Sequence, residues 1–321
     1  MSSPMLIISL DFELFWGMQD HVSLSDYEKN ILGGKAAIPK MLALFEKHGI
    51  HATWAAVGYL FGKNEEELRR YFPAELPTYD NAALSPYPIF GTIGKDESEA
   101  PSYYAPALIP MIAAVPGQEI ASHTFSHYYC REPGQTTEQF RSDLDAARSI
   151  AADHGFALTS IILPRNQCEP EYVPVMREAG FLAYRDEEND WIHEKVCFKP
   201  LLRILRLIDV YLPLTGQGGN VPRLENGIVN LPGSRIYRPF FKPLAALEWL
   251  KLRRIKGQMR HAAKNGQIFH LWWHPHNVGV RTELHMQQLE EIFAYYEKLK
   301  EKYGMRSLNM GEAAREILER G

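Results

Sequence analysis

The sequence is poor in cysteine. Its 321 residues include 3 cysteines, Cys130, Cys168 and Cys197, and no two of them form a C-x-x-C pair. An odd number of cysteines without paired spacing gives no disulfide framework. We therefore interpret them as reduced thiols, which are typical of proteins in a reducing compartment.

Long apolar runs and leader features are also lacking. No window approaches the ~20 uninterrupted apolar residues that a membrane-spanning helix needs. Residues 5–10 are apolar except for Ser9, but neither a basic stretch nor a small-residue cleavage site accompanies them. These absences predict a cytoplasmic protein without a membrane span.

The sequence has no excess of positive charge. Lysine and arginine number 35 against 39 aspartate and glutamate residues, and the pI is near 6.3. Domains that bind nucleic-acid phosphates are usually strongly basic, so we expect no nucleic-acid partner. The content of 45% hydrophobic and 23% charged residues is that of an ordinary globular protein.

What is present is an alternation of short apolar runs with segments of helical periodicity. Such alternation is typical of strand–helix units around a parallel sheet. The predicted strands are residues 6–10, 52–57, 119–121, 160–163, 183–185, 228–231 and 268–272. The predicted helices are residues 34–47, 137–154, 172–179, 244–265, 282–303 and 311–318. We expect one α/β barrel domain over residues 1–321, with long insertions at about 61–116 and 186–235.

Two acidic residues follow the first predicted strand. Alternation of side chains along a strand puts Asp11 and Glu13 on the same side. Neighbouring carboxylates repel each other, so we expect a cation beside them. The alternative is a solvated acidic turn without a chemical role.

Two histidines follow the third predicted strand. His123 and His127 stand four residues apart, the spacing that places two imidazoles on one side of a helical turn. Two imidazoles, a carboxylate and an open coordination position suit a hydrolytic Zn²⁺ or a similar divalent ion. Alone, two such histidines are more often packed or surface residues, but together with Asp11 and Glu13 they favour a metal site.

Three further segments complete the candidate set. Arg165 follows the strand at 160–163, where an arginine could hold a carboxylate ionised or form only a structural ion pair. Trp191 stands beside acidic residues, where its indole could flank a ligand or belong to the core. His274, with His276 close behind, ends the last predicted strand. An imidazole there can donate a proton to a leaving amine, or it can be hydrogen-bonded in place for structure alone.

Taken in order, these segments resemble the polysaccharide deacetylase superfamily (NodB homology, carbohydrate esterase family four). The matching pieces are SLDFE at 9–13, HATWAAVG at 51–58, EIASHTFSH at 119–127, LPR at 163–165 and WHP at 273–275. The resemblance covers about residues 5–280 apart from the two insertions. It implies a distorted (β/α)7-type barrel with one catalytic metal ion.

The resemblance also implies roles for individual residues. Asp11 resembles the general base, His274 the general acid and Arg165 the arginine that tunes the base. Glu13, His123 and His127 resemble the metal ligands, although the commonest family pattern opens with two adjacent aspartates. Residues next to these motifs are expected to contact the substrate: Trp16, Phe125, Trp191, Trp273, His276 and Asn277.

The implied activity is hydrolysis of an N-acyl group, acetyl or formyl, from a sugar. Zinc is the favoured ion, ahead of cobalt, manganese and nickel. A cytoplasmic enzyme would meet nucleotide- or lipid-linked intermediates of envelope polysaccharide, O-antigen or lipopolysaccharide biosynthesis rather than extracellular polymers. Two alternatives stay open: a hydrolase of cyclic, non-sugar amides and a non-catalytic carbohydrate-binding relative.

One segment departs from the acidic character of the chain. Residues 235–266 hold nine basic residues and one acid, Glu248. Such a segment could bind a phosphate-bearing substrate or contact an anionic membrane surface. The alternative is a solvated basic helix face with Trp249 in the core.

Overall fold

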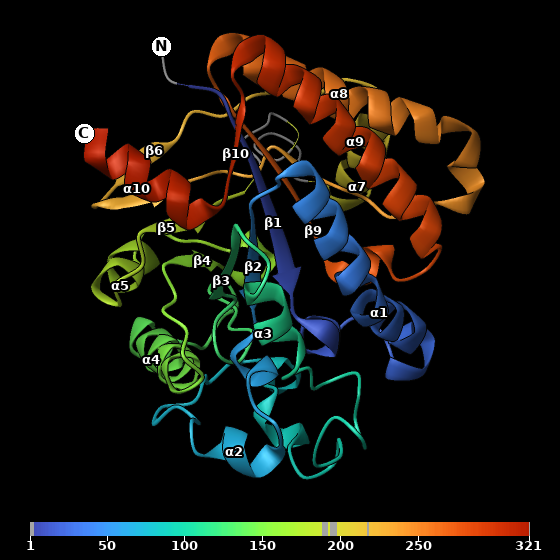
Figure 1. Cartoon of the computed structure of the whole chain (residues 1–321). Coiled ribbons are helices and arrows are strands. Elements are labelled where there is room, and N and C mark those ends of the chain that lie inside the picture. Colours follow the sequence, from blue (N-terminus) through green and yellow to red (C-terminus); the bar gives the residue numbers. More distant parts are fainter. Residues whose placement is uncertain (1–2, 188–191, 193–197, 217, 321) are drawn as a thin grey trace.

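The computed structural model describes residues 3–187, 192, 198–216 and 218–320 (Figure 1). The described chain is an α/β structure built around one 10-stranded, mainly parallel sheet, which confirms the predicted fold class. Within these residues, no helix has both the length and the apolar character needed to cross a membrane.

The predicted strands form the sheet in nearly their predicted positions. Parallel neighbours follow in the order β7 (Ile228–Asn230), β5 (Ala183–Arg185), β4 (Ser160–Ile162), β3 (Gln118–Ser122), β2 (Ala52–Ala56), β1 (Met5–Phe12) and β9 (Ile268–Trp273). Three short strands were not predicted: β6 (Arg223–Glu225), antiparallel to β7, β8 (Arg235–Ile236), parallel to β9, and β10 (Arg306–Leu308), parallel to β1. Among the described residues, the hydrogen-bonded path runs from β6 to β8 without closing.

The central strand β1 is buried along its whole length. Leu6, Ile8 and Leu10 belong to the main core, whereas Met5 and Ile7 belong to a second cluster. The final helix α10 (Met310–Arg320) covers that second cluster with Met310, Ala313 and Ala314. Strands covered on both faces read as continuous apolar runs, which is why their positions were predictable.

The main helices surround the sheet (Figure 1). They are α1 (Leu24–His48), α4 (Thr137–Asp153), α5 (Tyr172–Glu178), α8 (Glu248–Asn265) and α9 (Thr282–Tyr303). Helix α8 begins four residues later than its predicted start at 244, because Lys242–Leu247 form a 3-10 helix with a non-helical residue inside it.

Helix α1 begins well before its predicted start at residue 34. The Ser23 side chain caps it by accepting a hydrogen bond from the Asp26 N–H. Gly33 and Gly34 therefore lie inside the helix. A Cβ atom on Gly33 would lie 2.1 Å from the Gly279 carbonyl oxygen, and one on Gly34 would lie 2.8 Å from the His276 Cα. The two glycines let α1 touch the backbone of the turn that follows β9.

The two long insertions have structure of their own. Residues 61–116 contain α2 (Glu65–Arg69), α3 (Leu108–Ala113) and short 3-10 turns. The described part of 186–235 contains the unpredicted helix α7 (Lys199–Tyr211) together with β6 and β7. Helix α7 packs against α8 and contributes side chains to the pocket described below.

Candidate active site

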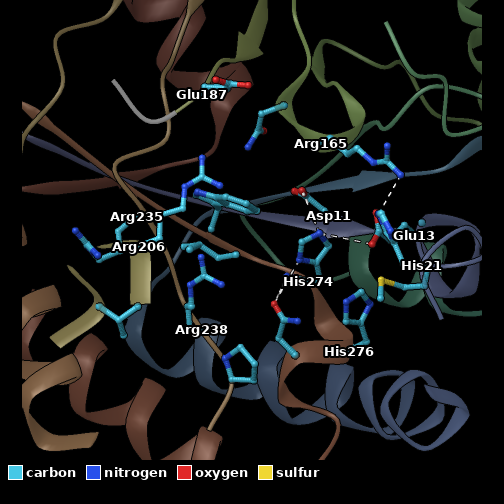
Figure 2. Close-up of a pocket in the computed structure, with 18 of the residues that line it drawn as sticks. Asp11, Glu13, His21, Arg165, Glu187, Arg206, Arg235, Arg238, His274 and His276 are labelled. Carbon is cyan, nitrogen blue, oxygen red and sulfur yellow. Dashed lines mark hydrogen bonds and ion pairs between the residues drawn. The ribbon is translucent and has the colours of Figure 1, made fainter. Parts of the chain in front are cut away.

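The carboxyl ends of the parallel strands bring the predicted chemical residues to one pocket of about 460 Å³ (Figure 2). Asp11 comes from β1, Glu13 follows β1, and His274 follows β9. His127 follows β3, and Arg165 follows β4. All five line the pocket, as expected for parallel strands whose ends meet at one edge.

Asp11 is held by an arginine that was not predicted to contact it. The two Asp11 carboxylate oxygens accept bonds from Arg185 Nη1 at 2.8 Å and Nη2 at 2.7 Å. Both side chains are buried, with 4% of Asp11 and 0% of Arg185 exposed. Burial alone would raise the pKa of Asp11, but the positive charges of Arg185 and His274 lower it below its ordinary value. Asp11 is therefore a buried carboxylate held in its ionised form.

The remaining Arg185 contacts hold the guanidinium in place. Ser9 Oγ accepts from Nη1 at 2.8 Å, and Asn166 Oδ1 accepts from Nε at 2.9 Å. The guanidinium carbon lies 4.2 Å from the centre of the Trp272 ring, in cation–π geometry. His270 Nδ1 lies 2.9 Å from the Leu231 carbonyl oxygen and therefore carries the proton, so Ser9 Oγ donates to His270 Nε2 at 2.8 Å. These contacts form a continuous polar network that holds Arg185 against the Asp11 carboxylate.

Arg165 does not hold Asp11, contrary to the role we assigned to it. Its guanidinium donates to Asp20 and, at 3.0 Å, to Glu132, and it lies 4.2 Å from the Tyr129 ring centre. The reason is geometric: the short turn after β4 has positive φ at Arg165 (57°), and its side chain reaches the outer rim of the pocket. Arg185, at the end of the next strand, points into the interior instead.

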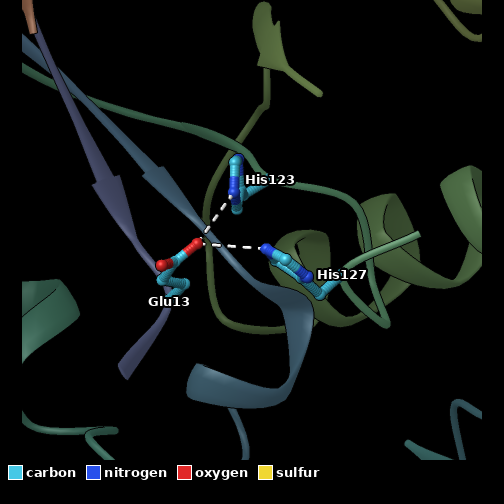
Figure 3. Close-up of side chains that lie close together, drawn as sticks. All are labelled: Glu13, His123 and His127. Carbon is cyan, nitrogen blue, oxygen red and sulfur yellow. Dashed lines mark hydrogen bonds and ion pairs between the residues drawn. The ribbon is translucent and has the colours of Figure 1, made fainter. Parts of the chain in front are cut away.

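Glu13, His123 and His127 form a buried cluster (Figure 3). Glu13 Oε2 lies 3.0 Å from His127 Nε2 and 3.3 Å from His123 Nε2. One ligand atom from each of the three residues lies within 4.8 Å of the others. Burial alone would raise the pKa of Glu13, but His274, His123 and His127 lower it well below its ordinary value. Burial lowers the pKa of His127 against the opposing effect of Glu13, which favours the neutral imidazole that binds metals.

The donor set fits a divalent cation. His123 Nδ1 lies 2.8 Å from the Ile162 carbonyl oxygen and must donate to it. In the neutral imidazole, the lone pair of Nε2 then faces the Glu13 carboxylate, and Nε2 has no hydrogen-bond partner. Two lone pairs that face each other in a buried site repel, and a divalent cation between them would bind both. The Ile162 carbonyl orients His123 as the outer partners of metal-binding histidines commonly do.

The segment 123–127 is a loop rather than the predicted helical turn. Thr124 (φ 63°) and His127 (φ 59°) lie in the left-handed region, and none of these residues is helical. Asp143 on α4 shapes the loop by accepting the Phe125 N–H at 2.6 Å and the Ser126 N–H at 3.1 Å. The i, i+4 spacing brings the two imidazoles together, but through this loop.

His274 faces both carboxylates. Its Nε2 lies 3.5 Å from Glu13 Oε1 and 3.7 Å from Asp11 Oδ2, and 22% of its side chain is exposed. Asn277 Oδ1 accepts the His274 backbone N–H at 3.3 Å, so Asn277 shapes the turn. His276 stacks on His274 with ring centres 4.9 Å apart, and burial together with His274 lowers the pKa of His276 to about 3. His276 is thus a neutral packing partner of His274 that also lines the pocket.

Three of the predicted substrate contacts are in the core. Trp16, Phe125 and Trp273 are fully buried and are not among the residues that line the pocket. Trp16 donates to the Tyr103 carbonyl oxygen at 2.8 Å, and Phe125 packs edge-on against Tyr59. Trp191 lies outside the described residues, whereas His276 and Asn277 do line the pocket.

The tryptophan of β9 that lines the pocket is Trp272. Side chains alternate along a strand, so Trp272 shares its face with His270 and His274, and Trp273 points to the opposite face. The same alternation can be read from the sequence, and it would have predicted Trp272 rather than Trp273 as the substrate contact. Arg185 gave a weaker signal, an arginine as the last residue of an apolar strand.

Comparisons with known proteins concern the sequence family and the fold. Residues 26–183 match the sequence model of the family described as polysaccharide deacetylase, a stretch that includes both histidines of the cluster. No curated protein matches the chain.

Solved structures share the fold over nearly the whole chain. A protein from Mycobacterium smegmatis, assigned as a polysaccharide deacetylase, is 13% identical with a TM-score of 0.60, covering 99% of this chain and 92% of its own. One from Pseudomonas aeruginosa PAO1 with the same assignment is 14% identical with a TM-score of 0.57, covering 97% and 89%. PuuE allantoinase is 14% identical with a TM-score of 0.55, covering 97% and 88%.

The fold and the pocket define an α/β protein with a buried Glu–His–His cluster at the carboxyl ends of its strands. The family match and the shared fold add the more specific assignment. Residues 26–183 match a polysaccharide deacetylase domain, and this match together with the shared fold supports the NodB-homology superfamily.

Proposed function

We propose that this protein is a metal-dependent hydrolase that removes an N-acyl group, acetyl or formyl, from a sugar. The observation that carries the proposal is one pocket with three features: the Glu13–His123–His127 cluster, the Asp11–Arg185 pair and His274. The match to the polysaccharide deacetylase family supports hydrolysis of N-acetyl sugars in general.

Glu13, His123 and His127 would hold the ion. Two imidazoles and one carboxylate suit zinc, and cobalt, manganese and nickel accept the same ligand types. When bound, a divalent ion supplies Lewis-acid chemistry for the acyl carbonyl and for water.

The chain's own side chains supply proton transfer. Asp11 is the base, because it is held ionised beside the cluster and can accept a proton from the attacking water. Arg185 fixes the orientation of both Asp11 oxygens through its paired bonds. His274 is the acid, because its Nε2 faces both carboxylates and can deliver a proton to the departing amine nitrogen. Trp272 adds an apolar wall on which a sugar ring can pack.

The finer proposal concerns the substrate and its place. We expect a nucleotide- or lipid-linked acyl sugar from envelope polysaccharide, O-antigen or lipopolysaccharide biosynthesis, processed in the cytoplasm. Support comes from arginines that line the pocket away from the cluster, since phosphate groups on a substrate would need cationic partners.

The first experiment is metal analysis by mass spectrometry of purified protein. Wild type should hold about one divalent ion per chain, as single-metal hydrolytic sites do. Glu13→Ala and His123→Ala should lose the ion. His154→Ala is the matched control, because His154 is a half-buried histidine paired with Glu67 elsewhere in the fold, and this variant should keep the ion.

Activity is then measured as free amine released from N-acetyl and N-formyl sugars. Release by wild type, lost in Asp11→Asn with the metal retained, is the expected result. A wild-type protein that takes up none of the four ions would refute metal dependence. Hydrolysis of allantoin without any release from acyl sugars would overturn the sugar substrate.

A further inference from the structure

The pocket has a second end with different chemistry. Arg206 on α7, Arg235 on β8 and the nearby Arg238 line the side that faces away from Glu13 and His21 (Figure 2). Asp209, Val210 and Thr215 complete this side. We call these six residues the arginine wall.

The one carboxylate of the arginine wall is already engaged. Asp209 accepts from Arg235 at 2.7 Å and from Arg254, which lies behind the wall on α8, at 3.1 Å. Thr215 Oγ1 donates to the same carboxylate. The wall itself holds Arg206, Arg235 and Arg238 against this single acid, so it keeps an excess of positive charge.

Arg206 supplies the observation that points to a ligand. Its Nε is buried and has no hydrogen-bond partner among the described residues, although the side chain lines the pocket. A buried donor without a partner is costly, and a guanidinium matches a phosphate with two parallel bonds.

We propose that the arginine wall binds a phosphate group carried by the acyl sugar, with Arg206 as its principal ligand. The assignment rests on the proposed function, in which the opposite end of the same pocket removes the acyl group. The sugar then lies between the two ends, with its phosphate fixing which end of the molecule reaches Asp11 and His274.

The test measures binding of inorganic pyrophosphate by calorimetry in the presence of a chelator, so that no metal ion contributes. Wild type should bind, and Arg206→Gln should lose about tenfold or more in affinity, the range for a hydrogen bond to a charged group. Arg203→Gln is the matched control, because Arg203 lies on the same helix and is exposed. Equal binding by wild type and Arg206→Gln would refute the subsite.

Competition against pyrophosphate identifies the source of the phosphate. One arm uses a uridine diphosphate N-acetyl sugar, and the other uses an N-acetyl sugar on a short isoprenyl phosphate. Competition in either arm supports the subsite and identifies its natural carrier, whereas competition in neither refutes the assignment to a substrate phosphate. These binding measurements need neither metal nor turnover. They therefore test the phosphate subsite even if the protein proves not to be a deacylase.

A separate observation concerns the outer face of α7. Large apolar side chains of this helix and its flanks are each between 37% and 67% exposed: Phe198, Leu201, Ile204, Leu207, Ile208, Leu212 and Leu214. Leu201, Ile204 and Ile208 follow helical spacing along one outward stripe. The opposite side of the same helix, with Arg206 and Val210, faces the pocket.

Exposed aromatic and basic residues also occur on α8, which packs against α7, and on the segment that precedes α8. Phe241 is 47% exposed, and Trp249, at the start of α8, is 57% exposed and thus outside the core. The exposed cations are Arg203 on α7, Lys242 in the segment before α8, and Arg253 on α8. By contrast, Arg235, Lys251 and Arg254 of the basic segment are buried and paired, so only part of that segment can meet a surface.

We infer that the outer face of α7 lies on an anionic membrane surface. Apolar side chains combined with aromatic residues and cations match the acyl and headgroup layers of such a surface. The exposed cations make this partner fit better than a neutral apolar one, since each basic residue close to an anionic surface adds to attraction. The pocket would then open beside the membrane.

Sedimentation with vesicles tests this inference. The anionic vesicles contain phosphatidylcholine and about a third phosphatidylglycerol. Wild type should bind them at least about tenfold more strongly than it binds pure phosphatidylcholine vesicles. Ile204→Ser/Ile208→Ser should lose this binding. The control is Leu76→Ser/Met111→Ser, which changes two comparably exposed apolar residues outside α7.

Two results would overturn the membrane assignment. The first is equal binding by wild type and the Ile204→Ser/Ile208→Ser variant. The second is a concentration-dependent dimer in analytical ultracentrifugation that the same variant abolishes, because the occupant of the face would then be a second copy of the chain.

Discussion

Replacing Arg185 by glutamine should destabilise this protein far more than replacing Arg165 by glutamine. Arg185 is fully buried and gives both Nη atoms to Asp11, whose side chain is 4% exposed. Two unit charges about 4 Å apart attract by about 4 kcal/mol at an effective dielectric constant of about 20. Removing one partner of a buried pair usually costs about 3–5 kcal/mol, because the other charge is left without compensation.

Arg165 is the matched control for this prediction. Its side chain is 26% exposed and pairs with Glu132, which is 27% exposed, and with the more buried Asp20. Partly exposed pairs of this kind contribute at most about 1 kcal/mol. The expected loss in the free energy of unfolding therefore differs several-fold between the two arginines, although one ends β5 and the other follows the neighbouring strand β4.

Urea unfolding at pH 7 in the presence of a chelator measures the difference, since bound metal would otherwise add to the free energy of unfolding. Arg185→Gln should lose about 3–5 kcal/mol of that free energy, and Arg165→Gln about 1 kcal/mol or less. Asp11→Asn in the Arg185→Gln background should restore part of the loss. A cost for Arg185→Gln no larger than that for Arg165→Gln, or no recovery in the double variant, would refute the reasoning.

Three further predictions concern neighbouring residues. Trp273→Ala should lower the free energy of urea unfolding by about 3–5 kcal/mol, because Trp273 is in the core. Trp272→Ala should mainly raise KM for an acyl sugar, because Trp272 lines the pocket. The opposite pattern would mean that the two faces of β9 are misassigned. His274→Ala should lower kcat by about 10²–10⁴ with metal content unchanged, and normal turnover would remove its role as the acid. Burial raises the pKa of Asp143 to about 6, above its ordinary 3.8, so protonation favours the folded state. As pH falls from 6 to 4, wild type should therefore gain about 1–3 kcal/mol relative to Asp143→Asn, and a pH-independent difference in urea unfolding would contradict this.

The elements that were predicted well are those with local causes. The seven strands that were predicted lie within two residues of their predicted ends, because burial on both faces demands continuous apolar runs. Helix α9 was predicted at its observed bounds, since Gly304 ends it in the left-handed conformation. The start of α1 was missed because Gly33 and Gly34 resemble a break. Glycine is needed at both positions because α1 contacts the turn after β9, a segment more than two hundred residues away in the sequence.

The sequence by itself determined which residues could carry the chemistry. Asp11, Glu13, His123, His127 and His274 stand in short motifs at strand ends, and parallel strands bring their ends to one edge whatever the details of packing.

Only the tertiary structure decided which groups meet across the interior. Arg185 on β5 reaches Asp11 on β1, although three strands separate them in the sheet order, because the sheet curves and inward side chains from opposite sides approach each other. The exposed face of α7 and the arginine wall were likewise settled by folding. A helix pattern shows which residues share a face, but the packing of its neighbours decides whether that face meets the core, a pocket or the surroundings.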